Sequence, residues 1–202
     1  VSDTEQIRNL YATIDSEFGR VDVVGNVAGE GNVGRPEDLP LDKVQEALQN
    51  LVVGRFASCQ EAGRRMLEQG RGSIINFGSI GGWNSLGRGH APYGMAMGAV
   101  IQMTRELSTE WASRGVRVNA ILPAQVWNDG LRKRVAEVPE LEETFKGGIP
   151  MGRLGNPEEI KGPAIFLASD ASSFVTGAIL PLSLIHISEP TRPRLISYAV
   201  FC

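Results

Sequence analysis

The stretch Ser73–Ser79, with the sequence SIINFGS, is a short apolar run that ends in a glycine turn. Apolar runs of this length, without alternating polar residues, are typical of strands that helices cover on both faces. A similar run, Val21–Val24, lies earlier in the chain, and another, Val116–Leu122, lies later. The three runs therefore predict buried strands of one parallel sheet.

Helical patterns separate and follow these runs, since apolar residues recur there every three or four positions. Residues 178–180 would form a final strand, whereas residues 124–150 are expected to be a long, mobile segment of mixed charge. Alternating strands and helices predict an α/β fold with a doubly wound parallel sheet in three layers, helix–sheet–helix. The expected helices are Asp3–Phe18, about Leu41–Gln69, about Pro92–Ser113, and a last one from Asn156 or Pro157 to Ala168.

The composition and charge of the chain argue against several classes of partner. The chain has 202 residues and a net charge of −3 without a basic cluster, which argues against a nucleic-acid partner. Its apolar runs are shorter than the roughly 18–20 residues that cross a bilayer, so no membrane partner is expected. Cys59 and Cys202 are the only cysteines and His90 has no matching partner, so neither a disulfide framework nor a metal site is expected. Free cysteines favour a reducing, cytoplasmic location.

Several short pieces of the chain occur in a fixed order on the predicted elements. They are Asn26–Gly29 after the first strand, Gly78-Ser79 after the second, Tyr93 fourteen positions later, Arg117–Pro123 on the third strand, and Gly152–Gly155, Pro157–Ile160, Phe166–Asp170 and Thr176-Gly177 near the end. Together these pieces resemble the short-chain dehydrogenase/reductase family of the classical type. The resemblance covers about residues 1–181 and implies a Rossmann-like domain that binds NAD or NADP. It also implies an enzyme that moves a hydride between this cofactor and a small alcohol or carbonyl substrate.

The resemblance also implies roles for single residues. Ser79 would orient the substrate oxygen, and Tyr93 would exchange a proton with it. The family's catalytic asparagine lies three positions before a helix glycine; counting back from Gly54 gives Leu51, so Asn50, one place away, is the candidate. Read without the family, Ser79 is an ordinary turn residue and Tyr93 packs at a helix start. The implied cofactor-binding residues are Asn26, Ala28, Gly29, Tyr93 and Pro123.

The chain departs from the family at position 97. A free phenol has a pKa of about 10, and a nearby ammonium stabilises its phenolate form. In the family this ammonium comes from a lysine one helical turn after the tyrosine, whereas this chain has Met97, which carries no charge and no donor. Three interpretations stay open: an enzyme using Ser79 and Tyr93, a binding or scaffold protein that has lost catalysis, or a misread codon, since AAG and ATG differ by one base.

Both ends of the chain depart from the family as well. The resemblance places Val1 after the family's first strands and its glycine fingerprint, so the sheet would be incomplete and the strand Val21–Val24 would be an exposed edge. Residues 1–181, expressed alone, are therefore expected to aggregate. Residues 182–192 and 196–202 match what the ends of a transposase-based sequencing adapter encode, so residues 182–202 are interpreted as adapter read-through. The resemblance implies a homo-dimer or homo-tetramer formed through the two long helices.

Overall fold

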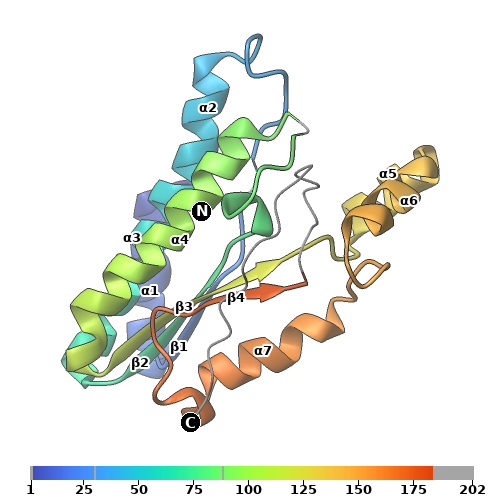
Figure 1. Ribbon diagram of the computed structural model, residues 1–202. Helices are drawn as coiled ribbons and strands as arrows, with labels where there is room; N and C mark the ends of the chain where they lie inside the picture. The colour runs from blue at the N-terminus through green and yellow to red at the C-terminus, as the bar shows by residue number, and fades with distance from the viewer. Residues whose placement is uncertain (1, 30, 88, 184–202) are drawn as a thin grey trace.

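The computed structural model describes residues 2–29, 31–87 and 89–183, and it contains one parallel sheet (Figure 1). Four strands run in the order β1-β2-β3-β4, and every neighbouring pair is parallel. The expectation of a parallel α/β sheet is confirmed, although the first strand begins two residues later than the apolar pattern predicts. The strands are β1 (Val23–Asn26), β2 (Gly72–Phe77), β3 (Val116–Pro123) and β4 (Ile179–Leu182).

Helices cover both faces of the sheet, which confirms the three layers (Figure 1). One face carries α1 (Thr4–Phe18), α3 (Gly54–Gln69) and α4 (Ala91–Trp111), and the other carries α7 (Glu158–Ala168). The ends of α1 follow from the sequence, because the Asp3 carboxylate accepts hydrogen bonds from the first-turn backbone N–H groups and Gly19 terminates the helix in the left-handed region.

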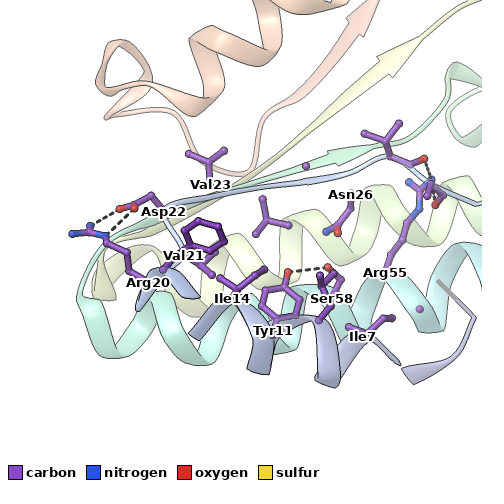
Figure 2. Close-up of a pocket in the computed structure, with 17 residues that line it drawn as sticks. Ile7, Tyr11, Ile14, Arg20, Val21, Asp22, Val23, Asn26, Arg55 and Ser58 are labelled. Carbon is purple, nitrogen blue, oxygen red and sulfur yellow. Dashed lines mark hydrogen bonds and ion pairs between the residues drawn. The ribbon is translucent and has the colours of Figure 1, made fainter. Parts of the chain in front are cut away.

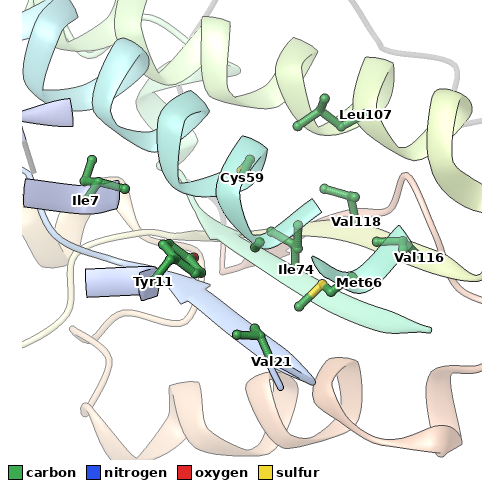
Figure 3. Close-up of a cluster of buried hydrophobic side chains, with 10 residues drawn as sticks. Ile7, Tyr11, Val21, Cys59, Met66, Ile74, Leu107, Val116 and Val118 are labelled. Atoms are coloured by element: carbon green, nitrogen blue, oxygen red, sulfur yellow. The ribbon is translucent and has the colours of Figure 1, made fainter. Parts of the chain in front are cut away.

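Alternate residues of β2 pack on opposite faces of the sheet. Ile74 lies in the larger core with Tyr11 and Met66 (Figure 3), whereas Ile75 packs with Leu167 on the face that α7 covers. This two-sided burial explains why the strand reads as a continuous apolar run rather than as an alternating one.

The helix expected over Leu41–Gln69 is interrupted. It consists of α2 (Leu41–Leu48), a π-helical turn η1 (Gln49–Val53) and α3, and the backbone N–H of Gly54 bonds to the carbonyl of Gln49. A π turn spans one residue more than an α turn. Apolar spacing predicted the helix correctly but carries no information on this local change of hydrogen-bond register.

The segment 124–150 contains two helices that the sequence analysis did not predict. They are α5 (Asp129–Glu137) and α6 (Glu140–Gly148), which lie beyond the carboxyl ends of β3 and β4 (Figure 1). The Asn128 side chain caps α5 by accepting from the backbone N–H of Leu131. Both helices are short and rich in charged residues, so the segment lacks the apolar periodicity that indicates a core-facing helix.

Strand β1 forms the edge of the described sheet, with β2 on one side only. Val23 on this strand is 45% exposed. A groove of about 520 Å³ runs along β1 beside α1, and Figure 2 shows its lining. The expected exposed edge is therefore present among the described residues.

The expectation for the end of the chain is only partly within the described residues. Leu182 is the last residue of β4 and pairs with Pro123, and residues 184–202 lie outside the part that the structure describes. None of the helices in the described ranges is both long and apolar enough to cross a membrane. Nor do the described residues bring three or more His, Cys, Asp or Glu side chains together as a metal site.

Candidate active site

The carboxyl ends of the parallel strands β1, β2 and β3 lie on the same side of the sheet. Asn26 ends β1, Phe77 ends β2 and Pro123 ends β3, and the strands are paired in register. The glycine loop with Ala28 and Gly29 leaves β1 on this side. Four of the residues expected to bind the cofactor therefore lie on the side of the sheet where α/β proteins bind ligands.

Asn26 is buried and fixes the end of β1. Its Nδ2 donates to Asn76 Oδ1 at 2.9 Å and to Cys59 Sγ at 3.2 Å. The Nδ2 of Asn76 in turn donates to Thr104 Oγ1 at 3.0 Å. The Asn26 side chain thus connects β1 to β2 and α3, and Asn76 extends the connection to α4. Burial raises the pKa of the Cys59 thiol to about 12.

The turn that carries Ser79 rests on the helix that carries Tyr93. Ser79 caps the short helix η2 (Ile80–Gly82), because its Oγ accepts from the backbone N–H of Gly81 at 3.1 Å. A Cβ added at Gly94, next to Tyr93, would lie only 3.2 Å from the carbonyl oxygen of Gly81. The two expected catalytic residues are therefore carried by turns in direct backbone contact.

The Tyr93 ring is enclosed by the loop that follows β1. A Cβ added at Gly31 would lie 2.9 Å from Tyr93 Cδ2, so only glycine allows this close approach. The His90 ring meets the Tyr93 ring edge-on, with 6.2 Å between the ring centroids. The Nδ1 atom of His90 is buried without a hydrogen-bond partner.

Tyr93 packs on its inner side against an apolar cluster. Leu51 and Met97 are 0% and 1% exposed and belong to this cluster. Position 97, where the family resemblance expects a lysine, is thus filled by a side chain that packs on its neighbours. Asn50 is half-buried, and Leu51 rather than Asn50 lies in the cluster with Tyr93. The other fully buried members are Ala96 and Val100.

Arg55 is a residue of this site that the sequence analysis missed. It is only 5% exposed, and its guanidinium donates to the carbonyl of Phe77 and to those of Val27 at 3.1 Å and Ala28 at 3.4 Å. It thereby clamps the carboxyl ends of β1 and β2. A signal was available, because Arg55 interrupts an apolar stripe of α3 formed by Cys59, Ala62 and Met66.

Burial and neighbouring groups change the pKa of the Arg55 guanidinium in opposite directions. Burial lowers the pKa of Arg55, while its electrostatic interactions with Tyr93 and Cys59 oppose that change. The Nε atom is buried and has no hydrogen-bond partner. A buried guanidinium with a free donor is therefore held by the loop that also contacts the Tyr93 ring.

Sheet and site together are those of a Rossmann-type oxidoreductase domain. A family described as enoyl-(acyl carrier protein) reductase matches residues 1–183. The chain belongs to the short-chain dehydrogenase/reductase family, in agreement with the resemblance of its motifs.

Relatives within the family include dehydrogenases of sugar alcohols. D-threitol dehydrogenase of Mycolicibacterium smegmatis is 36% identical over 180 residues, which cover 89% of this chain and 68% of that protein. Galactitol 2-dehydrogenase (L-tagatose-forming) of Cereibacter sphaeroides is 47% identical over 131 residues, 64% of this chain and 51% of the relative. The inactive 2-(S)-hydroxypropyl-CoM dehydrogenase 2 of Xanthobacter autotrophicus is 32% identical over 182 residues, 89% of this chain and 79% of the relative.

Solved structures agree with this assignment. NAD⁺-bound xylitol dehydrogenase has a TM-score of 0.83 and 29% identity, over 90% of this chain and 75% of that chain. Gluconate 5-dehydrogenase from Burkholderia cenocepacia J2315, in complex with NADP and tartrate, has a TM-score of 0.84 and 28% identity, over 90% and 70%.

Proposed function

We propose that this protein is an oxidoreductase that uses NAD or NADP and interconverts a small alcohol and its carbonyl product. The observation that carries the proposal is the backbone contact between the Ser79 turn and the first turn of α4, beside Tyr93, at the carboxyl ends of the strands. A hydroxyl and a phenol held there are suited to bind one substrate oxygen from two sides.

The reaction needs a proton and a hydride to leave the alcohol. A bound nicotinamide would supply the acceptor for the hydride of the carbinol carbon. Tyr93, as phenolate, takes the hydroxyl proton while the C=O bond forms, and Ser79 donates a hydrogen bond to the substrate oxygen. In the reverse direction Tyr93 returns the proton to the carbonyl oxygen, so protons and electrons balance in both directions.

The described residues fit the nicotinamide end of such a cofactor. Unpartnered donors or acceptors are costly when buried, and two of them, Arg55 Nε and His90 Nδ1, lie on this side of the sheet. The loop with Ala28 and Gly29 and the end of β3 at Pro123 would flank the cofactor, and Tyr93 would contact its ribose. Neither form of the cofactor is favoured over the other by these residues.

We take a polyol or a hydroxy acid as the substrate class. The names of the relatives that support this are those of threitol, galactitol and xylitol dehydrogenases and of gluconate 5-dehydrogenase. Residues 124–150 would select among such substrates, because α5 and α6 lie beyond the carboxyl ends of β3 and β4 (Figure 1).

Assembly and location complete the proposal. Apolar side chains on α3 and α4 face outward, since Phe56 is 45% and Met95 is 56% exposed. Such surfaces mark protein contacts, so we propose that α2, α3 and α4 form the interface of a dimer or tetramer. A free, buried Cys59 fits the cytoplasm. Neither nucleic acid nor a membrane is a proposed partner.

A second function is favoured by one observation. Met97 is buried in an apolar cluster beside Tyr93, so α4 supplies no ammonium to the phenol. A protein of this fold that binds a dinucleotide without turning over a substrate would show the same packing. One relative of the chain is likewise named as an inactive dehydrogenase.

Turnover and binding, measured together, separate the two functions. The complete reading frame that contains this chain would be assayed with NAD⁺ and NADP⁺ against threitol, galactitol, xylitol and gluconate. We expect turnover, and a loss of roughly 10²–10⁴-fold in kcat/KM in Ser79→Ala and in Tyr93→Phe, with dinucleotide affinity unchanged in Ser79→Ala. Dinucleotide binding without turnover in the unmodified protein would favour the second function.

A further inference from the structure

The charge beside Tyr93 has to come from an element other than α4. On the α4 side the ring packs against Leu51 and Met97, both fully buried in one apolar cluster. A phenol that exchanges protons near neutral pH needs a neighbouring cation, because its phenolate is otherwise disfavoured by burial. The question is which residue of the described chain supplies that cation.

Arg55 is held by the same segments that enclose Tyr93. The loop whose carbonyls at Val27 and Ala28 accept from Arg55 continues to Gly31, which touches the Tyr93 ring. Figure 2 shows Arg55 reaching from α3 toward the end of β1. Arg55 lies one helical turn after Leu51, which itself packs on Tyr93.

The third hydrogen bond of Arg55 is to the strand end that precedes Ser79. Its guanidinium donates to the carbonyl of Phe77, two residues before Ser79. The segments that hold the guanidinium therefore also contact the Tyr93 ring or lead into the Ser79 turn. Tyr93 opposes the lowering of the Arg55 pKa by burial. This arrangement does not depend on any residue of α4 other than Tyr93.

Among the residues that the structure describes, no carboxylate pairs with Arg55. Its hydrogen-bond acceptors are backbone carbonyls. Among the described residues, Tyr93 and Cys59 are the groups whose electrostatic interaction raises the Arg55 pKa against the effect of burial. The Cys59 thiol stays protonated, because burial raises its pKa to about 12. The remaining titratable group facing Tyr93 is His90, from the start of α4. A buried cation without a counter-ion favours an anion next to it.

We propose that Arg55 supplies the positive charge that favours the phenolate form of Tyr93, in place of a cation on α4. This inference rests on the proposed function, because it assigns a role to a residue of the same site. Arg55 is a positioning residue: the hydroxyl proton of the alcohol moves to the Tyr93 oxygen, and the guanidinium gives up no proton at any step.

The test compares Arg55→Met, Arg55→Lys, Met97→Lys and the double variant Arg55→Met with Met97→Lys, in the complete reading frame. Arg117→Met is the matched control, because Arg117 is also partly buried and also bonds to backbone carbonyls, but near the opposite ends of the strands. The first readout is kcat as a function of pH with a polyol substrate. The second, without any substrate, is the pH at which tyrosinate forms. The tyrosinate signal that disappears in the matching Tyr93→Phe background belongs to Tyr93.

We expect Arg55→Met to lower kcat by roughly 10²-fold and to shift both transitions, of kcat and of tyrosinate formation, to higher pH. Arg55→Lys and Arg117→Met should leave both transitions at their original pH. The double variant should regain at least part of the rate and the original profile. A loss of rate that is equal at every pH and is not rescued by Met97→Lys would overturn the proposal. If Arg55→Met does not fold, a loss of the profile in folded Arg55→Lys would overturn it as well.

The two readouts separate this inference from the proposed function. Absence of turnover in every variant, including the unmodified protein, would refute the oxidoreductase. The tyrosinate measurement would still decide whether Arg55 acts on Tyr93.

Discussion

Arg55, Leu51 and Met97 define the chemistry around Tyr93 more closely than the family motif does. Two of them are apolar and fully buried against the ring, and the third brings a buried guanidinium from α3. The motif predicted Ser79 and Tyr93 as a pair, and the structure places them on contacting turns. Arg55 was not predicted. It interrupts an apolar stripe of α3, which marks it as unusual, but that pattern does not identify its partners, which are backbone carbonyls.

Cys59 offers a test of burial at the scale of one residue. Burial raises the pKa of its thiol to about 12, so the thiolate is scarce in the folded protein at neutral pH. The stability that follows from this is fully present below the usual thiol pKa of about 8.5 and is lost as the pH rises toward 12. In a Cys202→Ser background, we expect Cys59 to react with a thiol reagent at pH 8 only as fast as the protein unfolds. Rapid labelling of the folded protein would contradict the buried thiol.

At the scale of elements, the contact of η2 with α4 decides whether Ser79 reaches Tyr93. A Cβ at Gly82 would collide with the backbone of Met97 and Gly98, and backbone cannot move aside as a side chain does. We expect Gly82→Ala to push the Ser79 turn away from α4, lowering both the melting temperature and kcat.

Gly162 provides the control for that prediction. It lies within α7, and a Cβ there would meet nothing within 4 Å. Gly162→Ala should stabilise the protein by about 0.5–1 kcal/mol, because alanine loses less backbone entropy in a helix. Thermal unfolding and kcat of both variants give the answer. Equal behaviour of the two variants would mean that η2 and α4 are not in close contact.

The elements themselves show what a sequence pattern can reveal. The strands of the sheet and the helices α1, α4 and α7 were predicted to within a few residues, since each buries an apolar face of regular period. The π turn at Gln49–Val53 was not predicted, because it changes hydrogen bonding without changing the apolar spacing. Helices α5 and α6 were missed, because few of their residues are buried.

On the scale of the whole molecule, the exposed edge at β1 governs solubility. An unpaired apolar strand beside an open groove is a template for pairing with other chains. We expect residues 1–183, produced alone, to aggregate, and Val23→Lys to reduce aggregation by placing a charge on the edge. Light scattering during refolding measures this. A soluble product that unfolds cooperatively without the substitution would contradict the prediction.

The central claim is that the protein moves a hydride through a site built around Ser79 and Tyr93. The most direct measurement uses a polyol deuterated at its carbinol carbons and follows deuterium into the reduced dinucleotide by mass spectrometry. The account predicts label in the dinucleotide with the unmodified protein and a severe loss of label with Tyr93→Phe. Dinucleotide binding without any label transfer, or transfer unaffected by Tyr93→Phe, would contradict it.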